Sequence, residues 1–259
     1  LVLAFKEASL IWLLQTTVPS IKLIKPRQQT TNMELGDLCM DYAEYRFTNE
    51  SLEAVMAGLQ VSEGDRIFAV CGAGDQAFAM VEKADYVLAF DRLKLQADYA
   101  RRTMNLIKDN INDVRKALES RMDRASTFYF LKRKRLEKIK SSMSRLQIEQ
   151  RDMYRLPKRG RFSKAYLSNA IRYSSYPSSE KLFEFLSALG RRLEKPGLIY
   201  LSLYYPLECE ISGARKVKTD YGTVLSEPFG LVIDKRLTKK AGLLEYESGI
   251  WRPVVLRKA

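Results

Sequence analysis

The sequence predicts an α/β domain built on a mostly parallel sheet, with helices on both faces and a closing pair of antiparallel strands. Short apolar runs, bounded by glycine or polar residues, alternate with amphipathic segments at helical spacing along the 259 residues. This alternation is typical of parallel sheets with helical crossovers. The clearest unit is residues 66–91, where two apolar runs enclose a glycine loop and a helical segment.

An N-terminal helical lead-in over residues 1–60 is expected to precede a main domain over residues 61–259. Residues 1–14 (LVLAFKEASLIWLL) are apolar but contain two charged side chains, and they are too short to cross a membrane. They are expected to form a helix packed on the domain, with a helix lying in a membrane interface as the alternative.

A helix is expected directly before the first strand. Residues 37–59 have helical spacing in their second half, and Asn49 or Ser51 is placed to cap that helix. A turn at residues 62–65 then leads into the strand at residues 66–70 (RIFAV).

A glycine loop follows this strand without a break. Residues 71–75 (CGAGD) form the loop, residues 76–83 are expected to be helical, and a second apolar run at residues 86–90 (YVLAF) ends at Asp91. Together they complete a βαβ unit. In such a unit the ligand lies outside the carboxyl ends of the strands, where the loop and Asp91 stand.

A long basic stretch without proline or glycine comes next. Helical spacing continues from Arg92 to about Arg145, which is far longer than an ordinary crossover. Residues 110–145 are therefore expected to be a basic helical insertion, made of two helices broken near Ser126 and Thr127.

The alternation of strands and helices resumes after the insertion. Strands are expected at residues 146–150 (LQIEQ), 164–171 (KAYLSNAI) and 198–205 (LIYLSLYY), with a helix at residues 180–193. After the last of these strands the helical signal disappears.

Two further strands are expected near the C-terminus. They lie at residues 231–234 (LVID) and 251–256 (WRPVVL), separated by a charged connection. A closing antiparallel pair suits them, and a single three-layer α/β sheet then accounts for the order of elements.

The composition excludes several kinds of chemistry. The chain has no histidine, which removes Ser-His-Asp triads, a histidine base and the usual histidine-containing zinc sites, and no metal site is expected. The cysteines are Cys39, Cys71 and Cys209; their odd number and wide spacing favour a reducing cytoplasm over a disulfide framework. The net charge of +13 favours contact with an acidic partner, either nucleic acid or an anionic membrane surface.

The glycine loop favours a nucleoside without phosphate groups. Gly72 and Gly74 permit close approach of the backbone, but the third glycine of a dinucleotide fingerprint is missing. S-adenosylmethionine, a sulfonium nucleoside, needs an acidic residue near its ammonium group, which Asp75 could supply. Asp91 can accept hydrogen bonds from both ribose hydroxyls.

Two later strand ends add to the predicted site. Asp152, just beyond the third strand, is placed to accept a hydrogen bond from the adenine amine. Asn169, at the end of the fourth strand, is expected to face the reacting end of the cofactor. These features predict a Rossmann-like, class I S-adenosylmethionine-dependent methyltransferase fold.

Four separate stretches carry a resemblance to a known family. They are residues 45–50 (YRFTNE), residues 71–76 (CGAGDQ), the pair Phe90-Asp91, and residues 167–170 (LSNA). In this order the chain resembles the diacylglycerol 3-amino-3-carboxypropyl transferases, which begin betaine-lipid synthesis from S-adenosylmethionine. The resemblance covers roughly residues 37–206.

The resemblance implies transfer of the aminocarboxypropyl group to a diacylglycerol-like lipid or another small acceptor, with methylthioadenosine as the leaving group. Within the matched motif, Arg46 could pair with the cofactor carboxylate. A surface ion pair between Arg46 and Glu50 is the alternative. The cofactor-binding residues predicted by the strand ends and the resemblance are Tyr42, Tyr45, Arg46, Asn49, Cys71, Gly72, Ala73, Gly74, Asp75, Asp91, Arg92, Asp152, Met153, Ser168 and Asn169.

The chemistry needs a nucleophile aligned with the cofactor, because a sulfonium is already an excellent leaving group, and a strong general base is not obligatory. Tyr173, Tyr204 and Tyr205 could orient an acceptor hydroxyl. A methyltransferase, acting for example on RNA, is one alternative, and a non-catalytic S-adenosylmethionine-binding protein is another. The basic segment 132–161 is predicted to contact anionic lipid, with RNA as the second choice. Such a protein is expected in the cytoplasm or at the periphery of a membrane.

Overall fold

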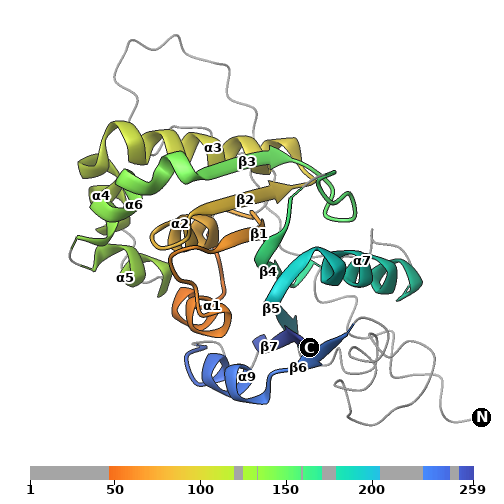
Figure 1. Cartoon of the computed structure of the whole chain (residues 1–259). Coiled ribbons are helices and arrows are strands. Elements are labelled where there is room, and N and C mark those ends of the chain that lie inside the picture. The colour runs from red at the N-terminus through yellow and green to blue at the C-terminus, as the bar shows by residue number, and fades with distance from the viewer. Residues whose placement is uncertain are drawn as a thin grey trace, which may run out of the picture. The chain divides into compact units, whose positions relative to one another are not determined.

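The computed structural model describes residues 47–119, 125–132, 134–158, 160–170, 179–204, 230–245 and 251–259. In these ranges seven strands form one sheet in the order β3-β2-β1-β4-β5-β7-β6 (Figure 1). The strands are β1 (Arg66–Val70), β2 (Tyr86–Asp91), β3 (Leu146–Gln150), β4 (Phe162–Ser168), β5 (Leu193–Tyr204), β6 (Leu231–Ile233) and β7 (Trp251–Lys258).

The pairing of the strands confirms the predicted fold class. The pairs β1–β2, β1–β4, β2–β3 and β4–β5 are parallel, whereas β7 runs antiparallel to both β5 and β6. The chain moves outward from β1 through β2 to β3 and then returns to β4 on the other side of β1. Ligands of open α/β sheets bind at such a reversal of strand order, outside the carboxyl ends of the strands.

Helices cover both faces of the sheet. On one face a hydrophobic core unites α1 (Leu52–Leu59), α2 (Asp75–Val81), α3 (Lys94–Asp109) and α9 (Lys235–Gly242) with alternate residues of the strands. On the other face α7 (Ser179–Arg192) packs through Phe185, Leu186 and Leu189 against a second core around Phe68 and Phe90. Alternation along each strand sends neighbouring side chains to opposite cores.

Helix α1 is fixed at its start and along its length. The hydroxyl of Ser51 accepts a hydrogen bond from the backbone N–H of Ala54 at 3.1 Å, which confirms Ser51 rather than Asn49 as the cap. Gly58 lies so close to the sheet that an added Cβ would be 2.8 Å from the ring of Tyr200. A glycine at this position therefore lets α1 rest directly on β5.

The basic insertion differs from the prediction of two helices. It contains α4 (Ile111–Glu119), α5 (Ala125–Leu131) and α6 (Arg135–Ser142), and α5 runs through the predicted break at Thr127. All three helices contribute buried side chains to the core shared with α1 and α2, among them Val114, Tyr129 and Ile139. The insertion is therefore an integral layer of the domain, because its amphipathic helices can bury their apolar faces only there.

The C-terminal part also corrects the prediction. The charged connection between the last two strands contains helix α9, which begins at Asp234, whose Oδ1 accepts the backbone N–H of Leu237 at 2.8 Å. Only Leu237 and Ala241 of this helix are buried. The helix is amphipathic but has few apolar residues, so its sequence resembles a charged connection.

Other element boundaries shift by a few residues. Strand β4 ends at Ser168, so Asn169 lies just beyond it, and β5 begins at Leu193, directly after α7. The predicted helix over residues 1–14 lies outside the described residues. In the described ranges, no helix is both long enough and apolar enough to span a lipid bilayer.

Candidate functional site

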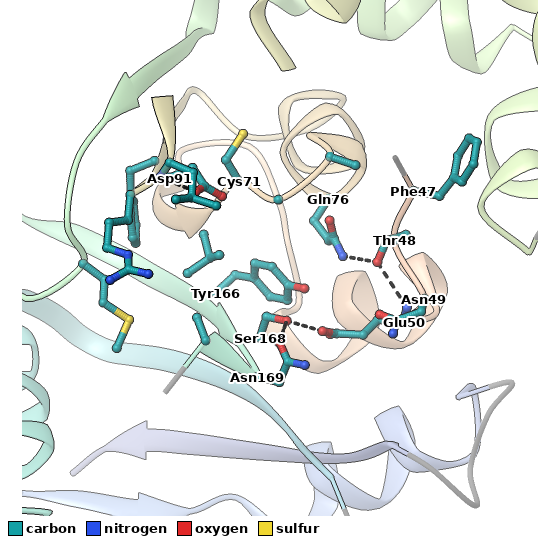
Figure 2. A pocket seen from close by; sticks show the side chains of 18 of the residues that line it. Phe47, Thr48, Asn49, Glu50, Cys71, Gln76, Asp91, Tyr166, Ser168 and Asn169 are labelled. Atoms are coloured by element: carbon teal, nitrogen blue, oxygen red, sulfur yellow. Dashed lines mark hydrogen bonds between the residues drawn. The ribbon is translucent and has the colours of Figure 1, made fainter. Parts of the chain in front are cut away.

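A cavity opens at the carboxyl ends of β1, β2 and β4 (Figure 2). Its lining residues are Phe47, Thr48, Asn49, Glu50, Val70, Cys71, Gly72, Ala73, Gln76, Phe90, Asp91, Arg92, Leu93, Arg151, Met153, Tyr166, Ser168, Asn169 and Ala170.

The glycine loop forms one wall of this cavity. Gly72 has φ +50°, and a Cβ at this position would meet nothing within 4 Å, so its backbone faces open space. Its carbonyl accepts a hydrogen bond from Gln96 Nε2 at 2.9 Å, while the N–H of Cys71 donates to Phe90 O at 2.7 Å. The loop is thereby held between β2 and α3 with its backbone presented to a ligand.

Gly74 and Asp75 have a different place from the one predicted. Neither lines the cavity. Gly74 is the N-cap of α2 with φ +97°, and a Cβ there would be 2.7 Å from Phe78. The carboxylate of Asp75 accepts the backbone N–H of Thr48 at 2.8 Å, so it ties the segment before α1 to the loop.

Asp91 lines the cavity at the end of β2, as predicted. Its Oδ1 accepts the backbone N–H of Leu93 at 2.9 Å, which fixes the carboxylate beside the glycine loop. Arg92 and Leu93 continue the same wall. A carboxylate at this strand end is suited to accept hydrogen bonds from a pair of neighbouring hydroxyls.

Asp152 is not brought to the main cavity. Its Oδ1 accepts the backbone N–H of Tyr154 at 3.0 Å, and the residue lines a separate depression with Arg92, Arg151 and Arg155. The next residue, Met153, is buried and does line the main cavity. The predicted role of Asp152 in adenine recognition therefore stays a prediction.

The segments that carry the family resemblance meet at this cavity. Residues 47–50 of the first motif lie on one side, residues 71–73 and Gln76 on a second, and residues 168–170 on a third. Thr48 links two of them, because its hydroxyl accepts a hydrogen bond from Gln76 Nε2 and its backbone binds Asp75. Asn49, Ser168 and Asn169 therefore lie where the sequence placed them.

Several predicted site residues cannot be compared with the structure. Tyr42, Tyr45, Arg46, Tyr173 and Tyr205 lie outside the described residues. Tyr204 ends β5, where its backbone pairs with Trp251. The predicted roles of these residues therefore stay predictions.

Glu50 is a site residue that the sequence reasoning missed. Its side chain is only 3% exposed, yet the residue lines the cavity, and the Ser168 hydroxyl donates a hydrogen bond to its Oε1. Burial raises the pKa of Glu50 from 4.5 to about 7; the hydrogen bond from Ser168 opposes this shift, and the charge of Glu245 adds to it. One feature of the sequence could have identified Glu50: it is an acidic residue inside the matched motif, directly before the residue that caps α1.

The Glu50 carboxyl should make the stability of the protein depend on pH. A folded-state pKa raised to about 7 means that the folded protein holds a proton that the unfolded chain loses near pH 4.5. The free energy of unfolding therefore falls as the pH rises from 4.5 to about 7, and this loss of stability is complete at higher pH. Glu50→Gln should be more stable than the wild type by about 3 kcal/mol at pH 8 and nearly equal to it at pH 4.

Urea unfolding at the two pH values measures this difference. Glu137→Gln is a suitable control, because Glu137 is exposed on α6 and its carboxylate pairs with Arg115 at the surface. If the free energies of unfolding of Glu50→Gln and wild type differ by the same amount at both pH values, the Glu50 carboxyl keeps an ordinary pKa.

Cys71 also lines the cavity, but its thiol is not a nucleophile. The residue is fully buried, and burial raises the pKa of the thiol well above its usual range, with the charges of Asp91 and Asp75 adding to the effect. The thiolate is the reactive form of cysteine. Cys71 therefore serves as a small apolar residue of the loop.

No protein-family model and no curated protein matches the sequence. Among solved structures, the chain is similar to the magnesium protoporphyrin IX methyltransferase ChlM from Synechocystis PCC 6803 with bound S-adenosylmethionine. The identity is 12%, the match covers 80% of this chain and 78% of that chain, and the TM-score is 0.50. The N-methyltransferase NodS from Bradyrhizobium japonicum WM9, in complex with S-adenosyl-L-homocysteine, is 10% identical over 80% of this chain and 84% of that chain, with a TM-score of 0.47. The match to the ChlM structure, together with the strand order, shows that the chain shares the Rossmann-like fold of that methyltransferase.

Proposed function

We propose that the protein binds S-adenosylmethionine in this cavity and transfers a group from it to an acceptor. One observation carries the proposal: the glycine loop after β1 and Asp91 at the end of β2 line the same cavity, at the reversal of strand order. The ChlM structure with bound S-adenosylmethionine, which shares the fold, supports the same cofactor.

The residues of the cavity fit this cofactor. The open backbone at Gly72 accommodates close approach, Asp91 offers a carboxylate for the ribose hydroxyls, and Met153 gives an apolar surface for a flat base. S-adenosylmethionine supplies a sulfonium that activates its attached carbons and leaves as a thioether. The protein itself then has to orient the acceptor.

The aminocarboxypropyl group is the transferred group that we favour. The support is the meeting of the matched motifs, since Phe47, Thr48 and Asn49 of the first motif line the cavity together with the glycine loop and residues 168–170. Methyl transfer is the alternative, and the fold supports it equally. A protein that binds the cofactor without turnover is the third candidate.

The basic insertion suggests where the acceptor is found. The guanidinium of Arg135 lies 3.9 Å from the ring centroid of Tyr129 and pairs with Glu82 at 3.0 Å, so Arg135 holds the insertion together. Lys134 and Lys138 are exposed on the same part of the insertion. We propose that such lysines contact an anionic membrane that supplies a lipid acceptor, with RNA as the second choice.

The nucleoside product distinguishes these functions. The protein is incubated with S-adenosylmethionine and either anionic vesicles containing diacylglycerol or RNA, and the products are separated by liquid chromatography and identified by mass. We expect methylthioadenosine with the vesicles. S-adenosylhomocysteine would instead indicate methyl transfer, and the absence of both products with both acceptors would leave only the binding function.

A further inference from the structure

The end of the cavity opposite Asp91 contains an acid that the proposed cofactor contacts do not use. Figure 2 shows Glu50, Ser168 and Asn169 together at this end, with Tyr166 between them and Asp91. Oε1 of Glu50 accepts the hydrogen bond from Ser168, whereas Oε2 is buried and has no hydrogen-bond partner among the described residues. A buried carboxylate oxygen that is left unpaired costs free energy, so its retention calls for a reason.

The surroundings of Glu50 are polar but do not neutralise it. Tyr166 of β4 and Ser202 of β5 face the carboxylate closely enough to lower its pKa, yet neither hydroxyl completes a hydrogen bond of normal geometry. In the part of the chain that the structure describes, the other ionisable groups that face it are Tyr200 of β5, whose hydroxyl has no hydrogen-bond partner there, and Glu245 beyond α9. The charge that these groups bring near Glu50 is therefore another carboxylate, which favours the protonated form of Glu50.

Glu245, the neighbouring carboxylate, is bound to the backbone. Its two oxygens lie 3.1 and 3.3 Å from the backbone N–H of Ser51, and both accept from that group. This contact anchors the start of α1 to the C-terminal part of the domain. Glu50 directly precedes Ser51 in the chain, but within the described ranges its Oε2 has no such backbone partner.

The other ionisable residues of the described lining are unsuited to receive a proton at neutral pH. Burial raises the pKa of Cys71 and that of Tyr166 well above their usual values, so both stay protonated. The lining arginines, Arg92 and Arg151, are always charged donors. Asp91 lies at the opposite end and is proposed to hold the ribose.

We propose that Glu50 is the catalytic proton acceptor for the nucleophile of the acceptor substrate, with Ser168 positioning its carboxylate at the reacting end of the cavity. This inference rests on the proposed transferase function. Ser168 adopts a left-handed backbone conformation at the end of β4, with φ +53°, which places it at the point where the strand stops. Non-glycine residues in this conformation are uncommon and often occur at functional sites.

The proton transfer balances the reaction. A lone pair of the acceptor atom forms a bond to the transferred carbon, the carbon–sulfur bond breaks, and its electron pair stays on the sulfur of the thioether product. The proton of the acceptor passes to the Glu50 carboxylate and then to solvent. The acceptor is therefore a nucleophile that carries a proton, such as a hydroxyl, and not a thioether or a tertiary amine.

The direction of the pH dependence follows from the deprotonated form being the active one. Because burial raises the pKa of Glu50 to about 7, kcat/KM of the wild type should rise with pH and level off above about that value. Glu50→Gln keeps the size and an oxygen acceptor for Ser168 but cannot take a proton. It should lower kcat/KM at pH 8 by about a hundredfold or more and remove the rise with pH.

Three measurements test the proposal on the full chain. They are pH profiles of product formation for wild type, Glu50→Gln, Glu50→Asp and the control Glu63→Gln, calorimetry of S-adenosylmethionine binding, and a carbon-13 NMR titration of the Glu50 carboxyl without ligand. Glu63 is exposed in the turn before β1, away from the cavity lining and from the basic insertion. We expect cofactor affinity unchanged within threefold in Glu50→Gln, partial activity in Glu50→Asp, wild-type activity in Glu63→Gln, and a titration midpoint near pH 7.

The outcomes separate this inference from the proposed function. A wild type that forms no product contradicts the proposed function itself. A wild type that is active, while Glu50→Gln retains its activity within threefold or keeps the same rise with pH, overturns the role of Glu50 alone. A Glu50 titration midpoint near the ordinary value of a glutamate overturns it as well, independently of any activity.

Discussion

Replacing Asp91 with Asn is expected to weaken the binding of S-adenosylmethionine by about a hundredfold. Asparagine keeps the shape of the side chain and an oxygen that can still accept the N–H of Leu93, so the end of β2 should stay in place. It loses the charge and one acceptor. Hydrogen bonds to a charged group contribute about 1.5–3 kcal/mol each, and two are lost or weakened with the ribose hydroxyls.

Isothermal titration calorimetry with S-adenosylmethionine and S-adenosylhomocysteine measures this effect. Asp85→Asn is the matched control. Asp85 is exposed and directly precedes β2, at the end of the strand away from the cavity. We expect the control to bind like the wild type. An affinity of Asp91→Asn within threefold of the wild type would mean that the ribose does not lie at Asp91.

Replacing Lys164 with Met is expected to destabilise the fold by about 3–5 kcal/mol, because it leaves a buried carboxylate without its cation. Lys164 of β4 is buried, and its ammonium donates to the carboxylate of Asp65 and to the carbonyl of Gln60. Asp65 also accepts the backbone N–H of Ser62 at 2.7 Å and the hydroxyl of Ser163 at 2.8 Å. This cluster joins the turn before β1 to β4.

Urea denaturation at constant pH checks the prediction against an exposed ion pair. Arg145 and Asp85 are 3.9 Å apart, and each is about half exposed. Arg145→Met should therefore cost less than about 1 kcal/mol. Adding Asp65→Asn to Lys164→Met should recover part of the loss. A cost below 1 kcal/mol for Lys164→Met alone would show that Asp65 is solvated and not dependent on the lysine.

The sheet was the most predictable part of the molecule. The bounds of β1 and β3 agree with the prediction, and β2 extends one residue further. In β1 and β2 an apolar run between a turn and a glycine or polar residue has few alternatives to a buried strand. In β3 only Leu146 and Ile148 are buried, and their alternation with polar residues is the signal. The insertion and α9 were less predictable. Basic amphipathic helices carry many charges, and only tertiary packing decides which few apolar side chains are buried and where each helix ends.

The candidate site also contains residues that were predictable from the sequence and contacts that were not. The positions of the glycine loop and Asp91 follow from the local order of strand, loop, helix and strand. The bond from the backbone of Thr48 to Asp75 and the burial of Glu50 against Ser168 instead arise from packing between distant segments. Local pattern fixes the end of a strand, whereas the partner and the burial of a carboxylate depend on segments far apart in the chain that meet only when it folds.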